Sequence, residues 1–180
     1  PEKIGLARHS LDSLSLSDLR LRPTGPDWAQ GLRDTWEPGE SNGLRRIDDI
    51  EEVARDYDTC RDRPDLDATS RLSPYLHFGE VSIRQVWHSL HQLELQGCST
   101  PGTASLRRQL YWRDFSAYML FHFPTMPDKP LRPEFEHFPW SGTESQLLAW
   151  QRGMTGYPIV DAGMRQLWHT GWMHNRVRMI

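Results

Sequence analysis

TGYPIVDAGMRQLWHTGWMHNRVRMI, residues 155–180, is the stretch that decides the fold class. Its first part has a helical pattern that ends at Gly171, and glycine is the residue most often found just after a helix. Its second part, from Gly171 to Ile180, has the same helical character and contains no further glycine or proline. The stretch therefore predicts two consecutive helices.

Capping patterns predict two more helices. Ser82 with Gln85, and Thr143 with Gln146, have the spacing of capping boxes, in which each side chain bonds to the other residue's backbone. Gly97 and Gly153 would stop the helices that begin there. The first of the two has an apolar stripe of Ile83, Val86, Trp87, Leu90 and Leu93.

The remaining helices are predicted from apolar residues spaced three and four apart. One long helix is expected from about Ser105 to His122, and one amphipathic helix across residues 44–62. The two-residue alternation typical of strands is nearly absent. We therefore predict an all-α fold for residues 28–180, preceded by a connector over residues 1–27 that is rich in turn residues near its end.

Composition narrows the class of protein. Two cysteines, no CxxC pair and no histidine cluster with zinc spacing argue against a disulfide scaffold or a metal site, and fit a cytoplasmic protein. No apolar run approaches the roughly 18 residues of a membrane span. Eight tryptophans in 180 residues indicate a tryptophan-rich core, or a protein that stacks flat rings or moves electrons. The chain starts with Pro1 and stops within a helical pattern, so we expect it to be part of a longer protein.

Helical spacing divides the last stretch into two faces. Met173, Val177 and Ile180 would form a core stripe, because positions i, i+4 and i+7 share one side of a helix. The opposite face would hold a ring, an amide, a guanidinium and a thioether, from Trp172, Asn175, Arg176 and Met179. That face suits a flat, polar, anionic ligand, although a helix lying between two packed layers would explain the pattern equally well.

Two further segments are candidate binding sites. In TSRLSP, residues 69–74, Ser73 is expected to cap a helix, and Thr69, Ser70 and Arg71 to form a nest for a phosphate or diphosphate. In the helix from Ser105, one side carries Gln109, Trp112, Arg113 and Ser116. There an indole could stack on a flipped base while an amide reads its edge.

With these residues placed, the sequence resembles the flavin-binding domain of the DNA photolyase and cryptochrome family over residues 28–180. The strongest blocks are TSRLSPYLHFGEVS, LYWRDF and residues 155–180. The resemblance is closest to bacterial photolyases that act on cyclobutane pyrimidine dimers. It implies a helical domain that holds FAD, and an antenna chromophore, a folate or a deazaflavin, on a separate upstream domain.

The resemblance also assigns roles to individual positions. It places FAD at Tyr57, Thr69, Ser70, Arg71, Leu72, Ser73 and Arg178, and the ligand face of the last stretch adds Trp172. It places DNA or a flipped dimer at Arg61, Gln109, Trp112, Asn175, Arg176 and Met179, and the helix side shared with Gln109 and Trp112 adds Arg113 and Ser116. Trp140 matches the surface end of a tryptophan chain that transfers electrons to the flavin.

Gln109 departs from the pattern of dimer photolyases, which usually have glutamate there, and an amide cannot supply a carboxyl proton. Trp112, Asn175 and Met179 nevertheless match the dimer pocket. We therefore predict a deoxyribodipyrimidine photo-lyase, a cytoplasmic monomer that acts on UV-damaged DNA. The alternatives are a cryptochrome-like FAD photoreceptor without repair activity, and a helical interaction module that binds no cofactor.

Overall fold

The computed structural model describes residues 13–15, 17–22 and 25–180. Within these ranges every regular element is a helix, which confirms the all-α prediction. Most of the connector predicted for residues 1–27 lies outside the described residues. The elements are α1 Gln30–Thr35, α2 Glu40–Asp48, α3 Ile50–Arg55, α4 Tyr57–Cys60, α5 Ser73–His77, α6 Ile83–Leu95, α7 Pro101–His122, the 3-10 helix η1 Pro133–His137, α8 Glu144–Gln151, α9 Pro158–Thr170 and α10 Asn175–Arg178.

Local capping chemistry fixes several helix ends. Both predicted capping boxes form, at the starts of α6 and α8. A third box that the sequence analysis missed, Thr100 with Thr103, starts α7 at Pro101, four residues before the predicted start. Gly97, Gly153 and Gly171 all have positive φ and follow α6, α8 and α9 as predicted.

The single helix predicted across residues 44–62 is wrong, because this segment forms the three short helices α2, α3 and α4. The breaks fall at Asp49 and Asp56, whose ψ angles of 2° and 15° lie outside the helical range. Aspartate competes for backbone hydrogen bonds and tolerates such breaks better than most residues do. The changes of direction let Ile47, Ile50 and Tyr57 all reach the core.

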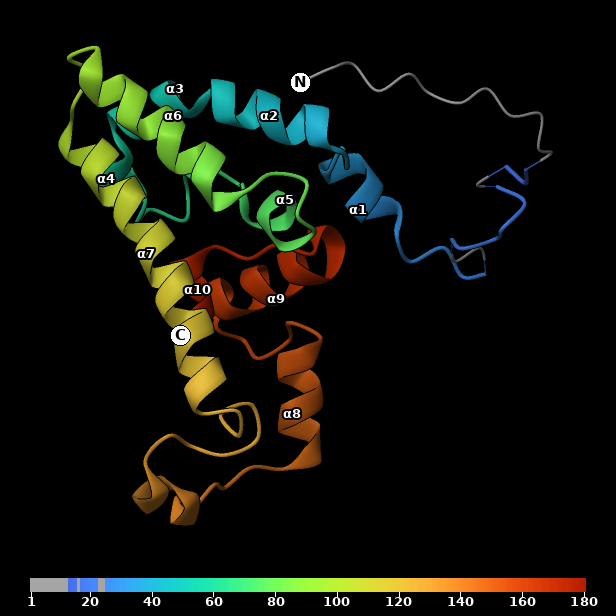
Figure 1. Ribbon diagram of the computed structural model, residues 1–180. Coiled ribbons are helices and arrows are strands. Elements are labelled where there is room, and N and C mark those ends of the chain that lie inside the picture. Colours follow the sequence, from blue (N-terminus) through green and yellow to red (C-terminus); the bar gives the residue numbers. More distant parts are fainter. Residues whose placement is uncertain (1–12, 16, 23–24) are drawn as a thin grey trace.

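The core lies where α3, α4 and α6 pack against the first half of α7, and buried residues of α2 and α5 join the same cluster (Figure 1). Val86 and Leu90 on α6 are fully buried, and Leu106 and Leu110 on α7 face them from the same cluster. Trp87, predicted in the apolar stripe of α6, is exposed and stacks on His91 instead. Its place in the stripe was therefore wrong.

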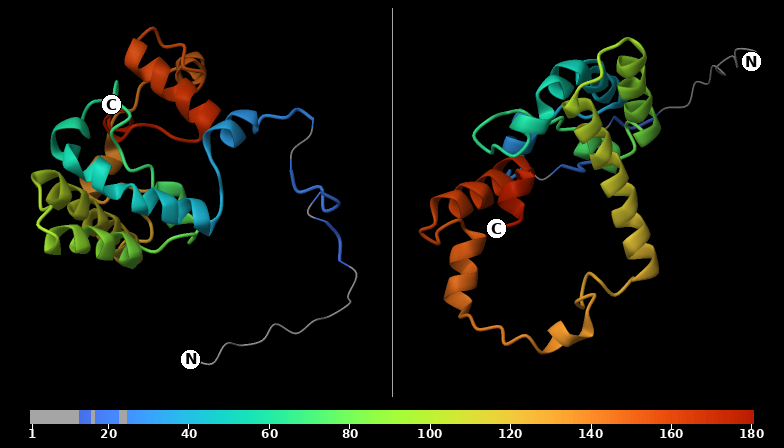
Figure 2. Two further views of the ribbon diagram at one scale, coloured as in Figure 1. Left: turned by 90° about the horizontal axis from the view of Figure 1, so that it is seen from above. Right: turned by 90° about the vertical axis from the view of Figure 1, so that its left-hand side faces the viewer.

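A second packed group joins α1, α8, α9 and α10. The indole Nε1 of Trp36 donates a 2.6 Å hydrogen bond to the carbonyl of Thr170, which ties the end of α1 to the end of α9. Figure 2 shows the second half of α7 extending away from the core, and the segment that contains η1 joining it to α8. Along this part of α7 the rings of Tyr111, Trp112 and Phe121 are exposed.

The final stretch differs from its prediction. The chain is extended from Trp172 to His174, and α10 spans only four residues. Gly171 ends α9 in the left-handed conformation, and His174 then acts as N-cap, its side chain accepting a hydrogen bond from the Arg176 N–H. Trp172 therefore leaves the predicted ligand face.

The predicted core stripe of this stretch is partly right. Met173 and Val177 are half-buried and pack on α9 at Gly163, where a side chain would collide with Val177. Ile180 is 73% exposed and does not belong to the core of the described residues.

Candidate functional site

The loop between α4 and α5 carries the predicted phosphate nest. Arg71 has a φ of 49°, the left-handed conformation that non-glycine residues rarely adopt. Its Nε donates a 2.8 Å hydrogen bond to Asp67, and its guanidinium lies 4.4 Å from the ring centre of Trp172. The Thr69 hydroxyl is buried and has no hydrogen-bond partner among the described residues.

The Thr69 hydroxyl, buried and without a partner among the described residues, is available to bind a ligand oxygen. A buried hydroxyl without a partner is costly, and a ligand oxygen would satisfy it. Beside it, Arg71 supplies a positive charge and Trp172 a flat ring, so the residues present fit a dinucleotide such as FAD. Leu72 is buried in the core and anchors the loop.

The predicted N-cap role of Ser73 is wrong. The helix α5 begins at Ser73, its N-cap is Leu72, and no side-chain hydrogen bond caps it. Instead, Ser70 accepts a long, 3.5 Å hydrogen bond from the backbone N–H of Leu72. The hydroxyl of Ser70 therefore stabilises the turn itself.

Tyr57 lies beneath the same region. Its ring is buried, and the Arg61 guanidinium lies 5.5 Å from the ring centre. Burial raises the pKa of the Tyr57 phenol, so the ring stays neutral at physiological pH. Tyr57 thus presents an uncharged ring at the start of α4.

A hollow of about 510 Å³ lies between α4, α7 and α10, and we call it the arginine hollow. It brings together four residues predicted to contact DNA, from segments far apart in the sequence. They are Arg61, Gln109, Trp112 and Arg176. The hollow is also lined by Asp58, Asp62, Pro101, Ser105 and Arg108.

Inside the arginine hollow, the side chains leave polar atoms available. The Gln109 amide donates a 3.2 Å hydrogen bond to the Ser105 carbonyl, so its own oxygen remains an acceptor. The indole of Trp112 is 57% exposed. A ring and an amide are thus offered together, as the sequence analysis predicted.

Asp62 is the residue of this site that the sequence analysis missed. Its two oxygens accept hydrogen bonds of 2.8 and 2.7 Å from Nε and Nη2 of Arg176, and Arg61 Nε lies 3.3 Å away. The Arg176 guanidinium holds the pKa of the Asp62 carboxyl below its usual range. The only local signal was an aspartate next to Arg61, because its main partner lies 114 residues away.

Asn175 and Met179 lie beside this ion pair. The Met179 sulfur is 3.8 Å from Asn175 Nδ2 and 3.8 Å from Arg176 Nη1. Two of the three residues predicted for the dimer pocket therefore contact each other directly, next to the arginine hollow.

Other predicted residues are placed elsewhere. Arg113 donates a hydrogen bond of 3.2 Å to the Leu76 carbonyl, and Ser116 one of 2.8 Å to the Trp112 carbonyl. Neither lines the arginine hollow. Trp140 is 88% exposed in the segment before α8 and contacts only the ring of Phe138 among the described aromatic residues.

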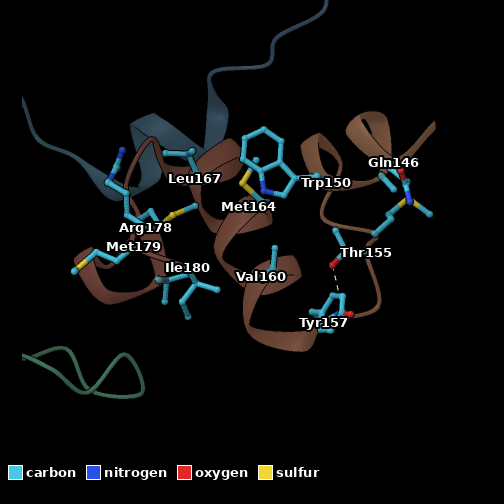
Figure 3. Close-up of a pocket in the computed structure, with 14 residues that line it drawn as sticks. Gln146, Trp150, Thr155, Tyr157, Val160, Met164, Leu167, Arg178, Met179 and Ile180 are labelled. Atoms are coloured by element: carbon cyan, nitrogen blue, oxygen red, sulfur yellow. Dashed lines mark hydrogen bonds between the residues drawn. The ribbon is translucent and has the colours of Figure 1, made fainter. Parts of the chain in front are cut away.

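A second hollow, of about 790 Å³, is lined by α8, α9 and α10, and we call it the Trp150 hollow (Figure 3). Arg178, predicted to lie by the flavin, lines it together with Met179. Most of its other lining residues are apolar, including Trp150, Tyr157 and Met164, which the sequence analysis did not assign to a site. The described residues contain no group of side chains suited to a metal ion, and no helix able to cross a membrane.

Comparisons with known proteins find similar chains. A family model described as the FAD binding domain of DNA photolyase matches residues 105–180. The chain is 47% identical over 169 residues to a deoxyribodipyrimidine photo-lyase of Agrobacterium fabrum, covering 93% of the chain and 35% of that protein. The crystal structure of a bacterial class III photolyase from Agrobacterium tumefaciens superposes with a TM-score of 0.86 at 44% identity, covering 96% of the chain and 36% of that protein.

Over nearly its whole length, the chain is similar to members of the DNA photolyase and cryptochrome family. A deoxyribodipyrimidine photo-lyase of Synechococcus is 42% identical over 172 residues, which cover 93% of the chain and 35% of that protein. Cryptochrome-2 of Arabidopsis thaliana is 39% identical over 178 residues, 95% of the chain and 28% of that protein. The chain thus spans about a third of the length of its photolyase relatives.

Proposed function

We propose that the full-length protein carrying this chain repairs cyclobutane pyrimidine dimers in DNA with light. The observation that carries the proposal is the arginine hollow, where three arginines, a ring and an amide converge from three separate segments. Two bacterial relatives named as photo-lyases, at 47% and 42% identity, support the same activity. In this proposal, residues 28–180 are the N-terminal part of the FAD-binding domain, and residues 1–27 connect it to an upstream domain with the antenna chromophore.

FAD is the cofactor in this proposal. Bound and reduced, it supplies the electron that light transfers to the dimer. Thr69 and Arg71 would meet its diphosphate, with Ser70, Leu72 and Ser73 shaping the loop. Tyr57, Trp172 and Arg178 would line other parts of the cofactor, and Trp140 would be the surface end of the electron-transfer chain.

The side chains of the arginine hollow would bind the lesion. The indole of Trp112 would stack on the flipped dimer, since every base offers a flat face to an aromatic ring. The free oxygen of Gln109 would accept a hydrogen bond from the base edge, while Asn175 and Met179 would contact the dimer from α10. Arg61 and Arg176 would bind the flanking phosphates.

A photoreceptor that binds FAD without repairing DNA is the second candidate. Gln109 favours it, because an amide cannot give a proton to the dimer or carry the charge of a carboxylate. The identity of 39% to Arabidopsis cryptochrome-2 is compatible with this role. The two functions differ in whether the dimer in DNA is lost under blue light.

The test uses the full-length protein with reduced FAD and an oligonucleotide that contains one thymine dimer. Under blue light we expect loss of the dimer, and no loss in the dark. Reduction of FAD by light without binding or repair of the dimer would favour the photoreceptor, and Gln109→Glu should then gain repair. A protein that stays colourless after FAD is added would support the interaction module instead.

Size-exclusion chromatography with light scattering would test the proposed monomer, and cell fractionation its cytoplasmic location.

A further inference from the structure

Asp62 lies between Arg61 and Arg176, two of the three arginines that line the arginine hollow. It forms a two-pronged ion pair with Arg176, at 2.8 and 2.7 Å, and lies 3.3 Å from Arg61. An acid in this place is unexpected, because a surface that binds DNA phosphates gains from unpaired positive charge. Its presence calls for a role other than attracting DNA.

The geometry of the pair restricts what Arg176 can reach. The acid occupies Nε and Nη2, which form the side edge of the guanidinium and the edge best suited to a phosphate. The remaining nitrogen, Nη1, lies 3.8 Å from the Met179 sulfur. Arg176 is therefore turned toward the dimer-pocket residues while its phosphate-binding edge is occupied.

The pair is also accessible to a competing phosphate. The side chains of Arg176 and Asp62 are 43% and 47% exposed, so solvent screens their attraction. DNA phosphates could displace Asp62, but only by breaking its ion pair with Arg176. Asp62 thus weakens the binding of intact DNA, which contacts the hollow only through its phosphates. For damaged DNA, contacts of the dimer in its pocket compensate for this loss of affinity.

We propose that Asp62 is a positioning residue that sets the preference of the protein for damaged over undamaged DNA. It holds Arg176 in the orientation that serves the dimer pocket and withholds its side edge from the phosphates of intact duplex. This inference rests on the proposed repair function and names a residue that determines its specificity.

The experiment measures DNA binding by the full-length, FAD-loaded protein in the dark, so that no repair occurs. Two duplexes of identical sequence, one with a single thymine dimer, are titrated at several salt concentrations. For Asp62→Asn we expect affinity for intact duplex to rise about 3- to 10-fold at low salt. The slope of log K against log salt should steepen by about one, because one more phosphate contact forms. The ratio of damaged to undamaged affinity should fall at least about 3-fold, because the gain for intact duplex is not matched by an equal gain for the duplex with the dimer.

Three further variants serve as controls. Asp65→Asn removes the same charge from a similar pair, Arg63 with Asp65 at 2.6 Å, which does not line the arginine hollow, and should leave the ratio unchanged. Asp58→Asn removes a charge from the hollow without freeing Arg176, and should raise both affinities equally. Asp62→Glu keeps the negative charge, and its ratio of damaged to undamaged affinity should be close to that of the parent protein. Bound FAD, read from its absorbance, reports that each variant is folded.

The outcomes separate the inference from the function on which it rests. If the parent protein prefers damaged DNA and Asp62→Asn keeps that preference, Asp62 has no role in specificity. Equal effects of Asp62→Asn and Asp58→Asn on both duplexes would also overturn the inference. They would mean that the effect of Asp62 on affinity comes only from its contribution to net charge. A parent protein with no preference for damaged DNA would contradict the repair function itself.

Discussion

The hydroxyl of Thr100 donates a 3.1 Å hydrogen bond to the carbonyl oxygen of Ala54. The Thr100 hydroxyl oxygen itself accepts a 3.0 Å hydrogen bond from the backbone N–H of Thr103, so one side chain both caps α7 and joins it to the end of α3. This joint holds α3 and α4, and with them Tyr57 and Arg61, against the helix that carries Gln109 and Trp112.

Replacing Thr100 with valine tests this joint. We expect the full-length protein to lose about 1–2 kcal/mol of stability, from the cap and the bond to Ala54 together. Thr143→Val is the matched control, because Thr143 forms a capping box at α8 without a bond to another helix. Its loss should be smaller, about 0.5–1 kcal/mol. Denaturant unfolding followed by circular dichroism measures both, and equal losses would refute the role of the joint.

Gly102→Ala should be destabilising for a steric reason. A Cβ at Gly102 would overlap the carbonyl oxygen of Ala54 and lie 3.0 Å from the backbone nitrogen of Tyr57. Separating α7 from α3 and α4 should cost about 1–3 kcal/mol, the range typical of overpacking. Gly142→Ala is the control, since the nearest atom is 3.9 Å away, on the Gln146 side chain. Thermal unfolding should be unchanged in the control, and an unchanged Gly102→Ala would contradict the close approach.

Thr69→Val should separate stability from cofactor binding. Valine has nearly the shape of threonine and removes the buried hydroxyl that has no described partner. The apoprotein should therefore be equally stable, or more stable by about 1 kcal/mol, whereas FAD should bind about 5- to 10-fold more weakly. Thermal unfolding and quenching of flavin fluorescence measure the two quantities. A less stable apoprotein with unchanged FAD affinity would mean that the hydroxyl has a structural partner.

Trp112→Ala should weaken binding to damaged DNA by about 10- to 100-fold, because stacking on one base contributes roughly 1–3 kcal/mol. Trp87→Ala is the control. Trp87 is exposed on the neighbouring helix α6 but lines a different hollow. Fluorescence anisotropy with dimer-containing duplex gives both affinities. Similar losses in the two variants would indicate general destabilisation instead of stacking.

The turn before α9 should depend on acid pH. The carboxylate of Asp161 accepts hydrogen bonds from the Thr155 hydroxyl at 2.6 Å and from the N–H groups of Thr155 and Gly156 at 2.7 and 2.9 Å. The Thr155 hydroxyl, chiefly, holds the pKa of this carboxyl below its usual value of 3.8. Because the folded-state pKa is the lower one, the stabilisation is complete above the unfolded pKa and is lost as pH falls through the folded value.

Hydrogen–deuterium exchange of a peptide spanning residues 154–158 measures this effect, after correction for the intrinsic pH dependence of exchange. Protection should persist at pH 5 and decline below about pH 3.8. In Asp161→Asn, protection should be weaker and should no longer vary with pH in this range. A variant that keeps the pH dependence would assign it to another group.

Local chemistry explains what the sequence predicted well. A capping box joins residues three apart, and a terminating glycine acts on the turn beside it, so the ends of α6, α8 and α9 were readable without knowledge of the fold. The breaks at Asp49 and Asp56 were not readable, because apolar spacing continues through them. They make sense only once α6 and α7 are in place for Ile50 and Tyr57 to pack against.

The candidate site divides in the same way. The family resemblance predicted Arg61, Gln109, Trp112 and Arg176, and the structure gathers them in one hollow. It could not predict Asp62, whose partner is distant in sequence, nor that Arg113 would bond to the Leu76 carbonyl. The position of Trp172 was wrong because helical spacing was extended past the left-handed Gly171.

Because α3 and α4 are short, local unfolding of these helices would disrupt the site. Helices of six and four residues are not stable in water alone, so these exist only while they are packed on α7. The loop with Asp62, Thr69 and Arg71 follows them directly. If this unit opened locally, it would disperse the cofactor nest and the arginine hollow in one event. A ligand in either place therefore favours the closed unit and strengthens the other site, with no pathway of contacts between them.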